Sequence, residues 1–198
     1  SDVCSSDLAA FRSRHVQVHL FDGYWEDIGT IRAFYEANLA LAQPNPPFQL
    51  VSPTAPVYSR ARYLPPSLFE GAQIKGSLIA DGCRIGKGAV IENSVLGLRC
   101  LIGENVTIRN SIVMGDDYYE EPDAARPCGP SHPTIGIGDG SVIEGAIVDK
   151  NCRIGNNVRV VNEQGIENGR DAPDCVIRDG IPVVVKDAEL PDGWTLRE

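Results

Sequence analysis

The sequence predicts a predominantly β protein, whose main part is a left-handed parallel β-helix preceded by a small α/β segment. Two observations predict the solenoid. Aliphatic residues recur in steps of five or six, and three successive steps sum to 17 residues, as expected when each side of a triangular coil points one side chain inward. Gly, Asn and Asp lie between these positions, where corners need tight, partly left-handed backbone. The aliphatic positions are Ile74, Ile79, Ile85, Ile91, Leu96, Ile102, Ile108 and Val113, followed by Ile137, Ile143, Val148, Ile154 and Val160.

The same spacing argues against other folds. An amphipathic α-helix would place apolar residues at intervals of about 3.6 and would contain few glycines. A β-sandwich would need longer alternating strands. The predicted corners are Asp81-Gly82, Gly86-Lys87-Gly88, Glu104-Asn105, Asp139-Gly140 and Asn156-Asn157.

The N-terminal part divides into two pieces. Residues 1–8 have neither the basic start nor the apolar core of a signal peptide. They back-translate into the end of a common sequencing adapter, so we interpret them as an artefact. Residues 9–43 are predicted to contain a strand at 16–20, where apolar and polar residues alternate, and a helix from Thr30 to about Ala42. Thr30 is the expected N-cap.

The rest of the chain is expected to be a linker and one domain. Pro44, Pro46 and Pro47 end the helix and make 44–70 a stiff linker. The β-helix domain is predicted to occupy 71–198. A long segment at 114–133 breaks the repeat and is expected to be a loop packed on the solenoid or on a neighbouring subunit.

Composition excludes several classes of function. The 198 residues carry a net charge of −9 and contain no apolar run approaching the ~20 residues that cross a bilayer. General nucleic-acid binding needs a basic surface, which the acidic balance disfavours. The cysteines form no C-x-x-C pair, so we expect buried thiols in a reducing cytoplasm rather than zinc or disulfides. They are Cys4, Cys83, Cys100, Cys128, Cys152 and Cys175.

Motifs along the whole chain after residue 8 resemble one family. They are GYWEDIGTIRAFYEANLAL, APVYSRARYLPPS, SIVMGDDYYE, IGIG, AIVDKNCRIG and VVVKDAELPDG. In this order they are similar to glucose-1-phosphate adenylyltransferase (ADP-glucose pyrophosphorylase), with the closest similarity to its cyanobacterial and plant-like branch.

The resemblance implies an activity and an assembly. Members of this family make ADP-glucose and diphosphate from ATP and glucose 1-phosphate, the committed step to glycogen or starch, in cytoplasmic homotetramers. Their phosphate-binding loop, first metal aspartate and sugar-phosphate lysine have no counterpart in this sequence. Residues 9–43 would then be the end of the nucleotidyltransferase domain, and the chain by itself is expected to be inactive.

Asp27, in the WEDIGT motif, matches the family's second metal-ligating aspartate. The resemblance therefore implies that it binds Mg²⁺, which prefers carboxylate ligands and neutralises charge during phosphoryl transfer. From the residues alone, Asp27 can equally serve the N-terminus of the following helix.

Four cations match the family's effector site. Lys150 and Lys186 match two activator lysines, and Arg62 matches a regulatory arginine. Arg60 stands where the oxygenic branch usually has glutamine. The resemblance implies that they bind a 3-phosphoglycerate-type activator and a phosphate-type inhibitor through charge-assisted bonds.

Other functions are built on similar solenoids. A non-catalytic regulatory subunit, or a β-helix that serves only as a scaffold, would contain the same solenoid. A hexapeptide-repeat acyltransferase would need a catalytic histidine in a coil loop, a position that only His132 has. A γ-type carbonic anhydrase would need three zinc histidines, but His15 and His19 lie outside the repeat.

Overall fold

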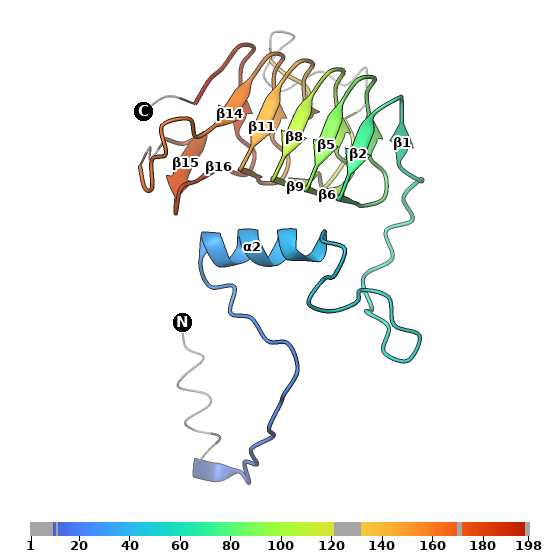
Figure 1. The fold of residues 1–198 in the computed structure, drawn as a ribbon, viewed down its shortest axis with the longest axis vertical. Coiled ribbons are helices and arrows are strands. Elements are labelled where there is room, and N and C mark those ends of the chain that lie inside the picture. The colour runs from blue at the N-terminus through green and yellow to red at the C-terminus, as the bar shows by residue number, and fades with distance from the viewer. Residues whose placement is uncertain (1–9, 11, 121–131, 170–171, 197–198) are drawn as a thin grey trace.

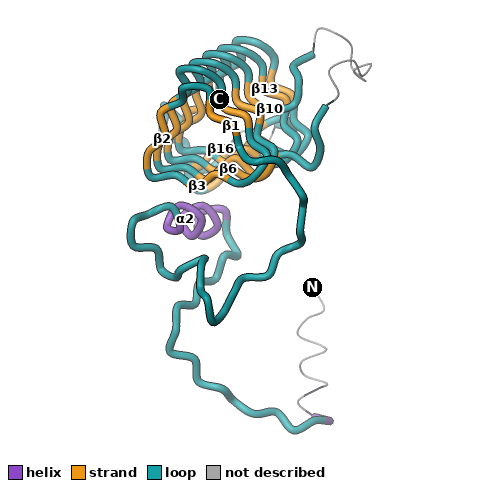
Figure 2. Tube along the Cα trace, turned by 90° about the vertical axis from the view of Figure 1, so that its right-hand side faces the viewer, coloured by secondary structure: helices purple, strands orange, loops and turns teal. Residues whose placement is uncertain are grey.

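The computed structural model describes residue 10 and residues 12–120, 132–169 and 172–196. From β1 onward these residues wind into a parallel β-helix with three flat sides (Figures 1 and 2). The predicted parallel β-helix is confirmed. The interpretation of residues 1–8 as an artefact lies outside the described residues.

Each side of the solenoid is one sheet, built from short strands that stack coil upon coil. Neighbouring strands pair in parallel, except β15 with β16. The first sheet has the order β1 (Leu68–Phe69), β4 (Arg84–Ile85), β7 (Leu101–Ile102), β10 (Gly136–Ile137), β13 (Arg153–Ile154) and β17 (Glu189–Leu190). The second has β2 (Gln73–Lys75), β5 (Val90–Glu92), β8 (Thr107–Arg109), β11 (Val142–Glu144) and β14 (Arg159–Val161). The third has β3 (Leu78–Ile79), β6 (Val95–Leu98), β9 (Ile112–Gly115), β12 (Ile147–Val148), β16 (Ile181–Val184) and β15 (Cys175–Arg178).

The register follows the predicted 17-residue period. Ile91 pairs with Ile74 on one side and with Ile108 on the other. The period is interrupted twice, where Ile137 stacks on Ile102 and where Val184 pairs with Val148. After each insertion the chain resumes stacking on the previous coil. The predicted loop begins slightly later than expected, because Met114 and Gly115 still belong to β9.

The inward-pointing aliphatic residues form the core. Ile91, Ile108 and Ile143 are fully buried, and most aliphatic positions of the other two columns are buried as well. Burying such a side chain contributes about 1.5–3 kcal/mol. The hydrophobic effect therefore accumulates coil by coil along the axis.

The corner between the second and third sheets is lined by left-handed residues. Asn93 and Asn110 both have φ of 46°, and Gly76 and Gly145 occupy the same place in the outer coils. Asn93 Nδ2 donates to Asn110 Oδ1 at 2.7 Å. Asn tolerates this backbone conformation and adds a hydrogen bond between coils.

Helix α2 (Ile31–Leu41) lies along the third sheet (Figures 1 and 2). Thr30 caps it as predicted, because Thr30 Oγ1 accepts a hydrogen bond from the Ala33 amide at 3.1 Å. Its apolar face packs on the outer side of β9, β12 and β16. The Tyr35 hydroxyl donates to the Asn110 carbonyl, and Gln43 Nε2 donates to Asn93 Oδ1 at 2.6 Å. The helix is thus tied to the Asn corner.

The segments on either side of α2 are mostly exposed. The strand predicted at 16–20 is absent from the structure, so that prediction is wrong for this chain. A strand needs a neighbour to satisfy its backbone groups, and no strand among the described residues pairs with this segment. Val18 and Trp25 remain 88% and 74% exposed. None of the helices that the structure describes is long and apolar enough to cross a membrane.

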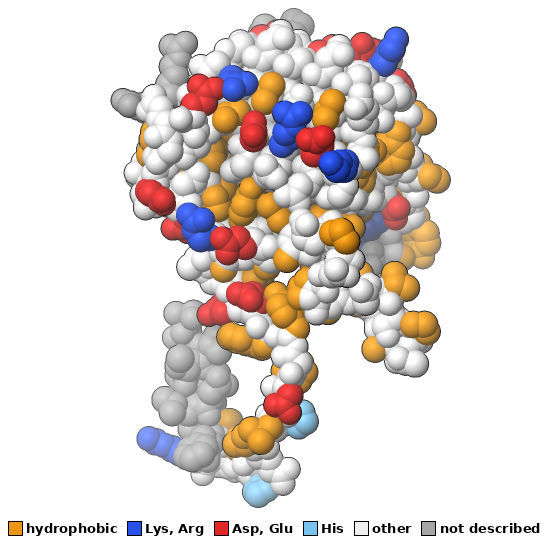
Figure 3. Space-filling view, in the orientation of Figure 1, with side chains coloured by type: hydrophobic (Ala, Val, Ile, Leu, Met, Phe, Trp, Pro, Cys, Tyr) orange, Lys and Arg blue, Asp and Glu red, His pale blue; other side chains and the backbone are white. Residues whose placement is uncertain are grey.

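The outer face of the second sheet carries a row of alternating charges (Figure 3). The strand register places Lys75, Glu92, Arg109 and Glu144 side by side across four coils. Arg109 Nε donates to Glu92 Oε2 at 2.9 Å. Opposite charges on neighbouring strands stabilise a sheet modestly. This face therefore presents a balanced charge rather than a basic patch.

Candidate functional site

Two of the predicted effector residues lie together at one corner of the solenoid. Lys150 follows β12 by two residues, and Lys186 follows β16 by two residues. These strands are neighbours in the third sheet, with Val148 opposite Val184. The Asp187 amide donates to the Lys150 carbonyl at 2.9 Å, so the two turns stack as well. Residues 36 positions apart in the sequence are therefore adjacent in space.

Asp117 lies between the two lysines. Its Oδ1 is 2.5 Å from Lys150 Nζ, and its Oδ2 is 4.0 Å from Lys186 Nζ. The hydrogen bond from Lys150 is the largest of the effects that lower the pKa of Asp117, and Asn151 and Lys186 add to it. Asp117 is thus the counter-ion of both lysines. The sequence prediction did not include it.

Asn151 fixes the position of Asp117. It is largely buried and has φ of 60°. Its Oδ1 accepts from the Asp117 amide at 2.8 Å, and its Nδ2 donates to Asp187 Oδ1 at 3.2 Å and to Asp117 Oδ2 at 3.4 Å. Asn suits this place because it adopts the left-handed conformation and offers both a donor and an acceptor.

The charges around the lysines are nearly balanced. Asp149 Oδ1 accepts from the Lys150 amide at 2.7 Å, and Asp187 bonds Asn151 as described above. The corner therefore contains two ammonium groups and the three carboxylates of Asp117, Asp149 and Asp187, and Asp117 is the one that pairs with both lysines. An anion bound here needs further cations, or the removal of a carboxylate, to be held firmly.

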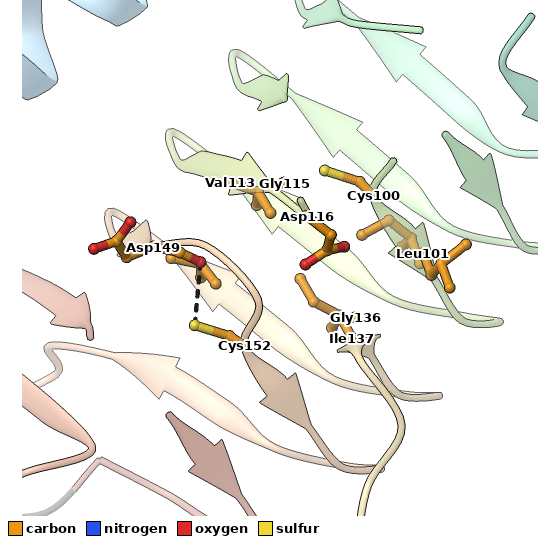
Figure 4. A pocket seen from close by; sticks show the side chains of 11 residues that line it. Cys100, Leu101, Val113, Gly115, Asp116, Gly136, Ile137, Asp149 and Cys152 are labelled. Carbon is orange, nitrogen blue, oxygen red and sulfur yellow. Dashed lines mark hydrogen bonds between the residues drawn. The ribbon is translucent and has the colours of Figure 1, made fainter. Parts of the chain in front are cut away.

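The residue before Asp117 is a buried carboxylic acid. Asp116 is 6% exposed and, with Cys100 and Cys152, lines a small cavity of about 10 Å³ (Figure 4). Burial raises the pKa of Asp116 to about 7, although the backbone N–H of Asn151 and the guanidinium of Arg99 oppose the change. The cavity is about the size of one water molecule.

The described cysteines are buried thiols, as expected for small apolar residues of the repeat. They are Cys83, Cys100, Cys152 and Cys175. Burial raises the pKa of Cys152 to about 12, so this thiol is protonated at neutral pH. Cys4 and Cys128 lie outside the described residues.

The two predicted effector arginines form no ion pair with Asp117, the counter-ion of Lys150 and Lys186. Arg60 and Arg62 are exposed in the linker, and neither forms an ion pair within the described part of the chain. Their convergence with Lys150 and Lys186 stays a prediction. The structure brings two of the four cations together and leaves the other two in solvent.

Asp27 forms a local turn. Its Oδ1 accepts from the Gly29 amide at 3.1 Å, directly before the helix cap. Across residues 12–120, 132–169 and 172–196, no three His, Cys, Asp or Glu side chains gather into a group able to hold a metal ion. One carboxylate is too few ligands for Mg²⁺. The described residues thus do not form a magnesium site, and the metal role of Asp27 stays a prediction.

His132, the residue on which the acyltransferase alternative depends, faces an acidic partner. Its Nδ1 lies within hydrogen-bonding distance of Glu189 Oε1 on β17. Nearby, Arg153 pairs with Glu120 at the start of the long loop, and both side chains are largely buried. These contacts tie both ends of the loop to the first sheet.

In a comparison with known protein families, a model described as the GLGC left-handed parallel β-helix domain matches residues 62–195. The match covers the solenoid from the end of the linker to the last coil and agrees with the predicted handedness. It also includes both lysines of the corner and Asp117.

Proposed function

The chain belongs to the GLGC left-handed parallel β-helix family, and we propose that it is the regulatory and oligomerisation part of a glucose-1-phosphate adenylyltransferase. The matched domain is the C-terminal domain of that enzyme. The whole enzyme would convert ATP and glucose 1-phosphate into ADP-glucose and diphosphate in the cytoplasm. The motifs from WEDIGT to VVVKDAE support this proposal and its assignment to the cyanobacterial and plant-like branch.

In this proposal the solenoid binds effectors and the nucleotidyltransferase domain performs the chemistry. Asp27 would contribute one ligand to Mg²⁺, which would neutralise phosphate charge during transfer. The remaining ligands would come from residues outside the described part of this chain. The exposed apolar residues around Trp25 fit a segment that packs against such a domain.

One observation carries the effector assignment: Lys150 and Lys186 meet at one corner because β12 and β16 are neighbours. Two ammonium groups at this spacing suit an anion with several oxygen atoms. We propose that a 3-phosphoglycerate-type activator and a phosphate-type inhibitor compete for them. Arg60 and Arg62 would complete the site in the assembled homotetramer.

The test begins with the longer coding sequence recovered from the source DNA. Its product is assayed for ADP-glucose synthesis with and without 3-phosphoglycerate. We expect synthesis that the effector stimulates several-fold, and we expect Lys150→Ala and Lys186→Ala each to abolish most of the stimulation. Lys87→Ala is the matched control, because Lys87 is an exposed lysine at another corner.

The alternatives give different results in the same assay. A product without synthetic activity would contradict the catalytic assignment and would indicate a regulatory subunit or a scaffold. Stimulation that survives both lysine substitutions would contradict the effector site while leaving the enzyme assignment intact.

A further inference from the structure

The place where an anion would bind between Lys150 and Lys186 already holds a carboxylate. We propose that Asp117 is an internal ligand of the two lysines, and that a phosphate-bearing effector binds by displacing it. This inference rests on the effector site proposed above. It adds a competitor within the chain, which lowers the apparent affinity of the two lysines for an effector.

The geometry makes the two ligands mutually exclusive. Asp117 directs one oxygen to each ammonium group, at 2.5 Å and 4.0 Å, which is how two oxygens of a phosphate group would bridge them. Lys150 cannot hold both at full strength, because its three N–H donors lie close together and the two anions repel.

Asp117 is free to give way. The side chain of Asp117 is 44% exposed, and that of Lys150 is 38% exposed. Its backbone is held independently, by the bond from the Asp117 amide to Asn151 and by the bond from the Asp116 amide to the Leu98 carbonyl at 2.8 Å. The carboxylate can therefore swing out while the chain stays in register.

The exchange selects ligands by charge. A monoanion would replace a carboxylate of equal charge and would gain little. A phosphate dianion brings one more negative charge to the two lysines, so the exchange favours it over chloride or acetate. The neighbouring carboxylates of Asp149 and Asp187 repel a dianion more than a monoanion, so they reduce this preference, and the two lysines must outweigh them.

Displacement should leave the start of the long loop in place. The Tyr119 hydroxyl donates to the Gly82 carbonyl at 2.8 Å, and Glu120 Oε2 accepts from the Ile135 amide at 3.0 Å, so neither bond depends on the Asp117 carboxylate. The exchange therefore moves one side chain and not the surrounding backbone.

The experiment measures inorganic phosphate binding to the purified chain at constant ionic strength, with chloride as the compensating salt. Asp117→Asn removes the competitor and keeps the side-chain shape, and we expect it to bind phosphate about 5-fold more tightly, the factor expected for an exposed ion pair. Asp187→Asn is the matched control. It removes one negative charge from the same corner, but Asp187 contacts Asn151 rather than a lysine, so we expect less than about a 2-fold change.

A second readout follows the displaced group. In the wild-type chain, saturating phosphate should shift the Asp117 carboxyl carbon resonance and leave hydrogen exchange of the Asp117 and Ile135 amides unchanged, because their hydrogen bonds do not involve that carboxylate. Chloride at the same ionic strength should not shift the resonance. Equal thermal midpoints of the three proteins would show that folding is intact.

Each outcome decides the inference. Tighter binding to Asp117→Asn than to Asp187→Asn supports it. If Asp117→Asn binds phosphate no more tightly than the wild type, the inference is overturned. If Lys150→Ala nevertheless abolishes phosphate binding, the effector site of the proposed function is still supported. Failure of every protein, including Asp117→Asn, to bind phosphate overturns both.

Discussion

The solenoid and the segment before it differ in strand pairing and in the burial of their apolar side chains. Within residues 68–190 most strands have a neighbour on each side, and the inward side chains of the central coils are fully buried. Residues 15–29 form no strand, and Val18, Leu20 and Trp25 are more than 70% exposed. A repeat supplies its own packing surface, because every coil presents the same column to the next. A non-repeating segment depends on a surface from elsewhere.

Helix α2 lies between these extremes. Its sequence precedes the linker, but Phe34 and Leu39 pack on the third sheet, and Tyr35 bonds the Asn110 carbonyl. The outer face of the third sheet therefore provides a packing surface for α2. Substitutions in the solenoid, in α2 and in the preceding segment should show how much each contributes to stability.

The largest contrast is expected between two aliphatic residues. Ile143→Ala deletes a fully buried side chain and should lower the free energy of unfolding by about 2–5 kcal/mol. Val18→Ala acts on a side chain that is 88% exposed and should change it by less than about 0.5 kcal/mol. Urea unfolding followed by circular dichroism measures both. Equal losses would contradict the division into a packed and an unpacked region.

The next effect concerns a buried acid and depends on pH. The pKa of Asp116 is raised from 3.8 to about 7 in the folded chain, so the folded state holds the proton more tightly than the unfolded state. The free energy of unfolding should therefore fall as pH rises from about 4 to about 7, and this contribution should be constant above that range.

Asp116→Asn should remove this decline. At pH 8 we expect the variant to be more stable than the wild type by roughly 2–4 kcal/mol, and at pH 4 by little. The exposed Asp22→Asn is the control from the N-terminal segment and should show no such difference. Asp117 acts in the opposite direction, since its lowered pKa favours folding at higher pH, but it is common to all three proteins. A pH-independent difference would show that the Asp116 carboxyl is not the titrating group.

A smaller loss is expected at the Asn corner. Asn110→Ala removes the bond from Asn93 and places a residue with a Cβ and no polar group at φ of 46°, so the loss should be about 1–2 kcal/mol. Asn110→Gly keeps the backbone conformation and loses only the side-chain bond, so it should cost less. Thermal unfolding measures both, and a larger loss for Gly than for Ala would contradict the assigned backbone strain.

The smallest effect should appear in α2 alone. Tyr35→Phe removes the bond to the Asn110 carbonyl and should weaken the docking of the helix by about 1 kcal/mol. Amide exchange in residues 31–41 should become faster, while that of β8 stays the same. Tyr58→Phe, at a side chain that is 91% exposed, is the control. A fall in the global midpoint would show that α2 is part of the solenoid's cooperative unit.

The sequence predicted those parts of the fold that local rules determine. One aliphatic residue per side identified the columns through Ile91 and Ile102, and Thr30 identified the start of α2. The final coil was missed, because β15 and β16 pair antiparallel and break the period. The strand predicted at 16–20 follows a valid local pattern, but a strand also needs a partner, which a sequence pattern does not supply.

The candidate site was predicted in part. Lys150 and Lys186 were found through motifs, and their meeting follows from stacking across the break in the repeat. Asp117 and Asn151 were missed, because their contact joins the start of an insertion to a corner 34 residues later. The repeat did contain a signal for this contact. Asp116 and Asp117 directly follow β9, Lys150 follows β12, and these two strands are neighbours in the third sheet.

Native-state hydrogen exchange of the whole chain tests the central claim most directly, namely that in-register stacking stabilises this protein and that the preceding segment depends on another surface. We expect strong protection in β5, β8 and β11, intermediate protection in α2, and exchange near the random-coil rate in residues 15–29. Protection spread evenly over both regions, or rapid exchange in the central strands, would contradict the account.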